Sequence, residues 1–140
     1  MRRIVADASV VIKWLLPARN EERDGERALN LLQAVRADEV GLVQPPHWLA
    51  EVAAVVTRLS PATVVEDISD LYAMNFRIVQ SEHVYSTACR LSRELDHHLF
   101  DTLYHAVALS IDGAVLVTAD ERYYAKVSRR GSLVLLRDFP

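Results

Sequence analysis

Residues 4–9 read IVADAS, a short apolar run followed by an acid, a small residue and a hydroxyl. The run Ile4-Val5-Ala6 contains no polar residue, which is typical of a strand buried on both faces of a parallel sheet. A carboxylate directly after such a strand needs an explanation, because burial disfavours its charged form. We therefore start from Asp7 and ask which fold and which chemistry place an acid there.

Length and charge limit the classes of protein to which the chain can belong. Its 140 residues fit one compact domain, and we expect a single domain over residues 1–140. The formal net charge of −3 does not attract a polyanion through the overall field of the protein, so contact with nucleic acid requires local groups. The basic residues available for this, most simply interpreted as surface groups, are Arg2, Arg3, Lys13, Arg19, Lys126, Arg129 and Arg130.

The cysteine content and the lengths of the apolar runs indicate a cytoplasmic protein. Cys89 is the only cysteine, so the chain has no disulfide of its own and suits a reducing compartment. No apolar run reaches the roughly 20 residues that a membrane-spanning helix needs. We therefore expect a cytoplasmic location and no association with a membrane.

Short β-rich runs alternate with longer stretches of helical periodicity, a pattern typical of a parallel sheet with crossover helices. The predicted order is β-α-α-β-α-α-β-α-α-β-α-β, and the predicted fold class is α/β, a three-layer α/β/α sandwich around a central, mainly parallel sheet. Strands are expected at residues 4–6, 40–43, 76–79, 115–117 and 133–136. Helices are expected at residues 9–16, 28–35, 47–59, 60–74, 81–96, 101–111 and 121–129.

Several helix boundaries follow from capping residues. Ser9 is expected to cap the first helix, which Pro17 would stop. Ser60 followed by Pro61 predicts a helix start, with Ser as N-cap and Pro at the first helical position. Ser81 is expected to cap the long helix at residues 81–96.

Two acids follow predicted strands, Asp7 after residues 4–6 and Asp120 after residues 115–117. If both strands are central and parallel, the two acids lie at the same edge of the sheet, where ligands bind in open α/β folds. Clustered carboxylates repel one another unless a cation compensates their charge. A hard divalent ion such as Mg²⁺ is the simplest explanation, because it prefers oxygen ligands.

Capping and solvation explain the same residues without a metal. Thr118 and Glu121 have the spacing of a capping box, and Asp101 precedes a helix. Helical periodicity puts Glu51 at the margin of an apolar stripe, beside Arg58, and by itself favours a solvated carboxylate. These alternatives remain open on the residues alone.

The set of motifs resembles the PIN-domain ribonucleases and, among them, the toxins of the VapBC toxin–antitoxin type. The matching stretches are IVADASVVIKWLLP at residues 4–17, HWLAEVAAVVTRL at residues 47–59 and LFDTLYHAVALSIDGAVLVTADERYYAKV at residues 99–127. His105 departs from the pattern, since an apolar residue is common at its position. The resemblance implies four acids around Mg²⁺ or Mn²⁺, with two hydroxyls that assist them: Asp7, Glu51, Asp101 and Asp120, with Ser9 and Thr118.

The function that this resemblance implies is metal-dependent hydrolysis of phosphodiester bonds in RNA, by the toxin of a type II toxin–antitoxin pair. The implied partners are an RNA substrate, a small antitoxin protein that blocks the acidic pocket, and a second copy of the chain in a homodimer. The apolar stretches at residues 10–16 and 52–56 exceed what one sheet face needs, which agrees with a partner. His97 and His98 are expected to be connector residues, because a metal-activated water needs no imidazole.

Three alternatives compete with this expectation. The first is a catalytically inactive PIN-like module that only binds RNA or protein. The second is a haloacid-dehalogenase-like phosphatase, which needs a second acid two residues after the first, where this chain has Ser9. The third is a receiver-type signalling domain, which needs paired acids after the first strand that this sequence lacks.

Overall fold

A five-stranded parallel sheet forms the centre of the chain within residues 1–16 and 22–140, the part that this computed structural model describes. The strand order is β3-β2-β1-β4-β5, and each pair of neighbouring strands is parallel. The predicted fold class is therefore confirmed. The strands are β1 (Arg2–Ala6), β2 (Val40–Gln44), β3 (Arg77–Ile78), β4 (Val115–Thr118) and β5 (Leu133–Leu135).

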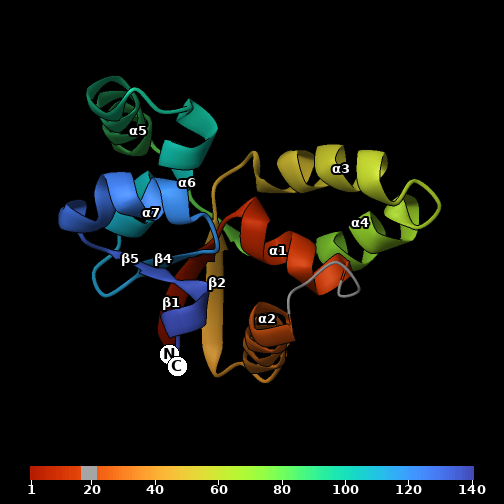
Figure 1. Cartoon of the computed structure of the whole chain (residues 1–140). Helices are drawn as coiled ribbons and strands as arrows, with labels where there is room; N and C mark the ends of the chain where they lie inside the picture. The colour runs from red at the N-terminus through yellow and green to blue at the C-terminus, as the bar shows by residue number, and fades with distance from the viewer. Residues whose placement is uncertain (17–21) are drawn as a thin grey trace.

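Helices cover both faces of the sheet (Figure 1). The chain runs from β1 outward to β3, then returns to β4 on the other side of β1. Because crossovers between parallel strands are right-handed, this reversal puts the two groups of helices on opposite faces. One face carries α1 (Ala8–Leu15), α2 (Glu22–Arg36), α3 (Trp48–Leu59) and α4 (Val64–Ala73); the other carries α5 (Glu82–Leu95), α6 (Leu99–Leu109) and α7 (Glu121–Val127).

The core lies on both sides of β1. Residues 4–6 of this strand are fully buried, as their apolar run predicts. Trp14 and Trp48 are also buried, so the apolar stretches of α1 and α3 mainly fill the core. The most exposed large apolar side chains on the described helices are instead Val65 and Tyr72 of α4, at 80% and 76%. Among the described residues, every helix is too short or too polar to span a bilayer.

The predicted order of elements is confirmed, but several helix starts differ from the prediction. Asp7, not Ser9, is the N-cap residue of α1, and α4 begins at Val64, three residues after Pro61. The helix expected from Asp101 begins at Leu99, where His98 Nδ1 accepts a hydrogen bond from the Phe100 amide. Ser81 caps α5 as predicted. The proposed stop at Pro17 and the base Arg19 lie outside the described residues.

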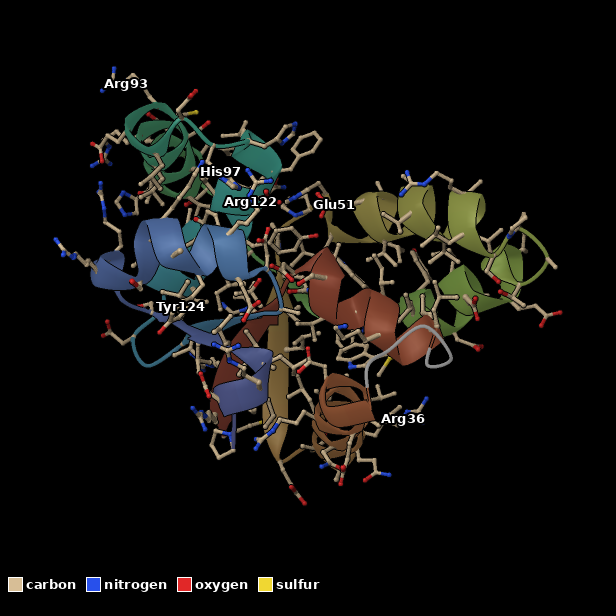
Figure 2. The ribbon with its side chains drawn as sticks, in the orientation of Figure 1. Arg36, Glu51, Arg93, His97, Arg122 and Tyr124 are labelled. Carbon is tan, nitrogen blue, oxygen red and sulfur yellow. The ribbon has the colours of Figure 1, made fainter. Side chains whose placement is uncertain are left out.

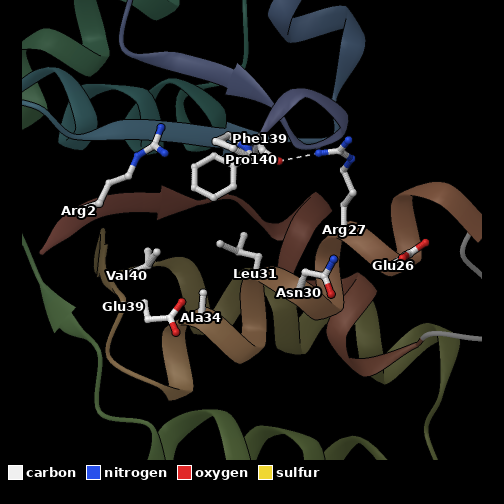
Figure 3. Close-up of a pocket in the computed structure, with 10 residues that line it drawn as sticks. All are labelled: Arg2, Glu26, Arg27, Asn30, Leu31, Ala34, Glu39, Val40, Phe139 and Pro140. Carbon is white, nitrogen blue, oxygen red and sulfur yellow. Dashed lines mark hydrogen bonds between the residues drawn. The ribbon is translucent and has the colours of Figure 1, made fainter.

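Residues near the C-terminus pack beside the amino ends of the strands, opposite the carboxyl ends, where Asp7 lies. Arg27 Nη1 of α2 donates a hydrogen bond to the Phe139 carbonyl at 2.7 Å, and the Arg2 guanidinium lies 4.6 Å from the Phe139 ring centre (Figure 3). A cavity of about 510 Å³ lies here, between α2 and the C-terminal residues. The carboxyl ends of the strands therefore remain available for a separate site.

Candidate metal centre

Asp7 lies at the carboxyl end of the central strand, where two hydroxyls hold its carboxylate. Ala6 pairs with Val117 in the parallel register of β1 and β4, so the residues that follow both strands meet. Ser9 Oγ donates to Asp7 Oδ1 and Thr118 Oγ1 donates to Asp7 Oδ2. Both hydroxyls that the resemblance implied are therefore in contact with Asp7.

The same hydroxyls tie together the turns that follow β1 and β4. Ser9 Oγ accepts a hydrogen bond from the Ala119 amide at 2.9 Å, and Thr118 Oγ1 accepts one from the Asp120 amide at 3.0 Å. Neither hydroxyl acts as the helix cap that its position suggests. Instead each hydroxyl donates to the acid and accepts from the β4–α7 turn, which fixes the position of Asp7.

Gln44 supports Asp7 from the other neighbouring strand, a role that the sequence analysis missed. Its buried side chain accepts from the Ala6 amide at 3.1 Å and donates to the Ala6 carbonyl at 2.7 Å. These two bonds hold the backbone of the residue just before Asp7. The signal in the sequence is a polar residue at the end of the apolar run VGLV, at residues 40–43.

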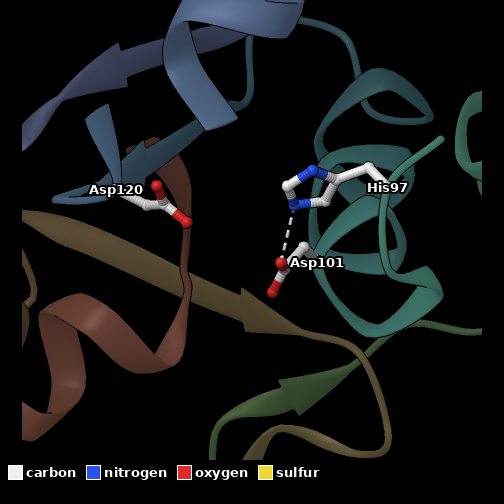
Figure 4. Close-up of side chains that lie close together, drawn as sticks. All are labelled: His97, Asp101 and Asp120. Carbon is white, nitrogen blue, oxygen red and sulfur yellow. Dashed lines mark hydrogen bonds and ion pairs between the residues drawn. The ribbon is translucent and has the colours of Figure 1, made fainter. Parts of the chain in front are cut away.

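Asp101 and Asp120 lie near each other at the starts of two different helices (Figure 4). Asp101 lies in the first turn of α6, and Asp120 is the N-cap residue of α7, where its Oδ1 accepts from the Tyr123 amide at 3.0 Å. The cap of α7 is therefore Asp120 and not Thr118, the residue that the capping-box spacing indicates. One ligand atom each from His97, Asp101 and Asp120 lie within 4.8 Å of one another, a grouping that could hold a metal ion.

Glu51 lies in the first turn of α3, at the end of that helix nearest α6 (Figure 2). Its side chain is only 23% exposed. Tyr104 Oη donates to Glu51 Oε1 at 3.4 Å, and His47 Nε2 lies 3.7 Å from Glu51 Oε2. The solvated position that periodicity favours is therefore wrong, whereas a part for Glu51 in metal binding stays a prediction.

Charge interactions connect the four acids. Burial raises the pKa of Asp7 to about 6; hydrogen bonds from Ser9 and Thr118 oppose this rise, and the charges of Asp101 and Asp120 add to it. Burial also raises the pKa of Glu51 to about 7, and the charges of Asp101 and Asp7 contribute to the rise. Carboxylates from separate segments therefore lie close enough for their charges to disfavour the ionisation of Asp7 and Glu51.

The donor atoms fit a hard divalent cation. The four acids supply carboxylate oxygens, the ligands that Mg²⁺ and Ca²⁺ prefer and that Mn²⁺ also accepts. A bound cation would favour the ionised forms of Asp7 and Glu51, reversing the effect that burial and mutual repulsion have on their pKa values. The residues present therefore suit a hard divalent ion.

Two histidines without a predicted role make defined contacts, and one of them, His97, lies beside this site. His97 lies in the connection between α5 and α6, as expected, and its Nε2 lies 2.8 Å from Asp101 Oδ2. Helical spacing does not predict this contact, because His97 precedes α6, which begins at Leu99. His105 is buried, with Nδ1 3.0 Å from Tyr123 Oη and Nε2 2.8 Å from the Gly131 carbonyl.

Comparison with known proteins identifies a family. The sequence model of the family described as "PIN domain" matches residues 4–129, a range that contains all four acids. The chain also resembles the "Crystal Structure of PAE2754 from Pyrobaculum aerophilum", with a TM-score of 0.64 and 16% identity over 96% of this chain and 90% of that chain. At this identity the likeness shows the fold alone. No curated protein sequence matches the chain.

Proposed function

Because this chain belongs to the PIN domain family, whose members are generally metal-dependent nucleases, we propose that it is an endoribonuclease that hydrolyses RNA with Mg²⁺ or Mn²⁺. The observation that carries the proposal is that acids from distant segments lie close together, so that the charges of Asp101 and Asp120 act on Asp7 and the charges of Asp101 and Asp7 act on Glu51. A structural role for these acids would not require them to lie together, because their repulsion costs stability.

Each residue of the site has a part in the proposal. Asp7 and Asp101 are the proposed direct ligands, and Glu51 and Asp120 complete the site directly or through water. Ser9 and Thr118 orient the Asp7 carboxylate through the hydrogen bonds described above. A divalent ion held here supplies a Lewis acid for a phosphate oxygen and lowers the pKa of a bound water.

Cleavage of a mixed RNA pool tests the proposal. We expect cleavage in Mn²⁺ or Mg²⁺ that stops on chelation and is lost in Asp7→Asn. The control is Asp112→Asn, the same substitution at an exposed position in the turn between α6 and β4. Sequencing the cleaved ends would identify the target, and single-stranded DNA in parallel would test the preference for RNA.

The main alternative is a PIN-like module that binds RNA or protein without cleaving it. This alternative predicts that labelled RNA is retained by the protein but stays intact in both metal ions, for the wild-type chain as for Asp7→Asn. The full set of acids supports the enzyme, because a module that only binds a polyanion gains nothing from clustered negative charge.

We further propose that the chain is the toxin of a type II pair, acting in the cytoplasm, with a small antitoxin that covers the acidic site. The support is the similarity of its motifs to toxins of the VapBC type. A homodimer is part of the proposal, and the exposed Val65 and Tyr72 of α4 are apolar side chains that a partner would cover. Expression should arrest growth, and co-expression of a small DNA-binding protein encoded beside the gene should restore it. Growth unaffected by the wild-type chain would contradict the toxin role, and light scattering would test the dimer.

A further inference from the structure

His97 lies between Lys126 and Asp101, and Asp101 is one of the acids of the proposed metal centre. On one side its Nε2 is 2.8 Å from Asp101 Oδ2, as Figure 4 shows. On the other side its Nδ1 is 3.1 Å from Lys126 Nζ, in α7. The three side chains come from the α5–α6 connection, α6 and α7, and they form one continuous line of polar contacts.

The contact with Lys126 determines which nitrogen of His97 carries the proton. A lysine ammonium group can only donate, so Nδ1 must accept and therefore has a lone pair. The ring proton is then on Nε2, which donates to Asp101 Oδ2. Lys126 is itself near the last carbonyls of α5, at 3.5 Å from that of Leu95 and 3.4 Å from that of Asp96.

Neighbouring rings fix the orientation of the imidazole. The His97 ring packs on Tyr123, with centroids 4.7 Å apart and planes at 56°. Tyr123 Oη is in turn 3.0 Å from His105 Nδ1, and it donates there because His105 Nε2 must donate to the Gly131 carbonyl. The His97 side chain is 14% exposed, whereas that of Asp101 is 39% exposed. The packed ring of His97 thus hydrogen-bonds the more exposed carboxylate of Asp101.

We propose that His97 is a positioning residue that orients the Asp101 carboxylate toward the divalent ion and does not itself ligate the ion. The inference rests on the proposed function, since it assumes that Asp101 is a metal ligand. Ligation by Nε2 would need a lone pair on that nitrogen, which the donation from Lys126 to Nδ1 opposes. Hydrogen-bond partners of metal ligands typically contribute 10- to 100-fold to metal affinity.

Direct metal binding separates positioning from ligation. We would titrate Mg²⁺ and Mn²⁺ into the wild-type chain, His97→Phe and His97→Gln by calorimetry. His97→Phe keeps a ring against Tyr123 but loses the donor, and we expect about tenfold weaker binding of both ions. His97→Gln keeps an amide donor at a similar reach, so it should recover most of the affinity. His83→Phe, the same substitution at an exposed position of α5, should bind both ions like the wild-type chain.

The state of the ring can be read without metal or substrate. In nitrogen-detected NMR spectra of the metal-free protein, His97 should show the tautomer with the proton on Nε2. Lys126→Met keeps the length of the side chain but removes the donor to Nδ1; because Asp101 Oδ2 still accepts from Nε2, the proton should stay on Nε2 in this variant as well. Thermal unfolding would confirm that each variant is folded.

The outcomes that overturn the inference are distinct. A loss of affinity confined to Mn²⁺ would show that His97 is a ligand, because imidazole favours Mn²⁺ over Mg²⁺. Unchanged affinity of His97→Phe for both ions, or a proton on Nδ1 in the wild-type chain, would show that the bond to Asp101 does not matter. If the wild-type chain binds neither ion, the proposed function fails, and this inference fails with it.

Discussion

Replacing Asp7 by Asn should stabilise the metal-free protein, although it removes a ligand from the proposed metal centre. The pKa of Asp7 rises from 3.8 to about 6, first because the group is buried and further because Asp101 and Asp120 carry negative charge. At about 1.4 kcal/mol for each pH unit, ionised Asp7 lowers the free energy of unfolding by about 3 kcal/mol at neutral pH. Asparagine is similar in shape and carries no charge, so it avoids this cost.

The hydrogen bonds of Asp7 offset part of the gain. Ser9 and Thr118 both donate to the carboxylate, whereas an amide offers one accepting and one donating side. One hydroxyl proton therefore loses its acceptor in Asp7→Asn, at a cost of about 1 kcal/mol. The net stabilisation is about 2 kcal/mol, which for a chain of this size raises Tm by about 6 °C.

The assay is thermal unfolding followed by circular dichroism at pH 7.5, first with EDTA and then with excess Mn²⁺. In EDTA, Asp7→Asn should unfold at a higher temperature than the wild-type chain, and Asp112→Asn should match the wild-type chain. In Mn²⁺ the wild-type chain should gain stability by binding the ion, whereas Asp7→Asn should change little. A lower Tm for Asp7→Asn than for the wild-type chain in EDTA would refute the claim that burial and neighbouring negative charges make ionised Asp7 destabilising. An equal gain from Mn²⁺ in both proteins would refute its role as a ligand.

Further predictions concern pH, the support of Asp7 and the packing of α5. The folded protein holds the protons of Asp7 and Glu51 more tightly than the unfolded chain does, because both pKa values are raised on folding. In EDTA, the resulting stabilisation is fully present below the unfolded pKa values near 4. It is lost as pH rises through about 6 for Asp7 and about 7 for Glu51. In urea unfolding at pH 4.5, 6 and 8, the free energy of unfolding should therefore decline less with pH for Asp7→Asn than for the wild-type chain. Equal declines in the two proteins would contradict the raised pKa of Asp7. Gln44→Leu leaves the buried amide and carbonyl of Ala6 without partners and should destabilise the chain by about 3 kcal/mol in the same experiment; a loss below about 1 kcal/mol would argue against those bonds. Ser81→Ala removes the cap of α5 and should cost about 1 kcal/mol of stability with no change in Mn²⁺ affinity measured by calorimetry; weaker Mn²⁺ binding would show that the effect reaches the site.

The fold could be predicted because its signals are local. The buried run at residues 4–6, the amphipathic stripe of residues 47–59 and the strand at residues 115–117 each show their periodicity within one element. Their order then requires a layered α/β fold with two acids at one edge. The boundaries were predicted less accurately where a hydroxyl or a proline sits near a helix start. Pro61, for example, lies in the turn before α4 and not in the helix.

The site was less predictable because its contacts are not local. Ser9 and Thr118 have the sequence pattern of helix caps, yet their hydroxyls bond Asp7, and for Thr118 that partner is 111 residues away. Periodicity indicates a solvated Glu51, since it cannot report that Tyr104 of α6 covers this carboxylate. Family resemblance, not periodicity, assigns Glu51 to the proposed site. The role of His97 depends on Lys126, and no spacing rule connects these two residues.

The bond between Thr118 and Asp7 also bears on when the protein becomes active during its synthesis. The acid near the start of the chain is held by a hydroxyl that the ribosome adds more than a hundred residues later. A nascent chain that ends before β4 has neither this hydroxyl nor Asp120. An unfinished chain would therefore lack a complete centre, and under the proposed function it could not cleave RNA around the ribosome that is still making it.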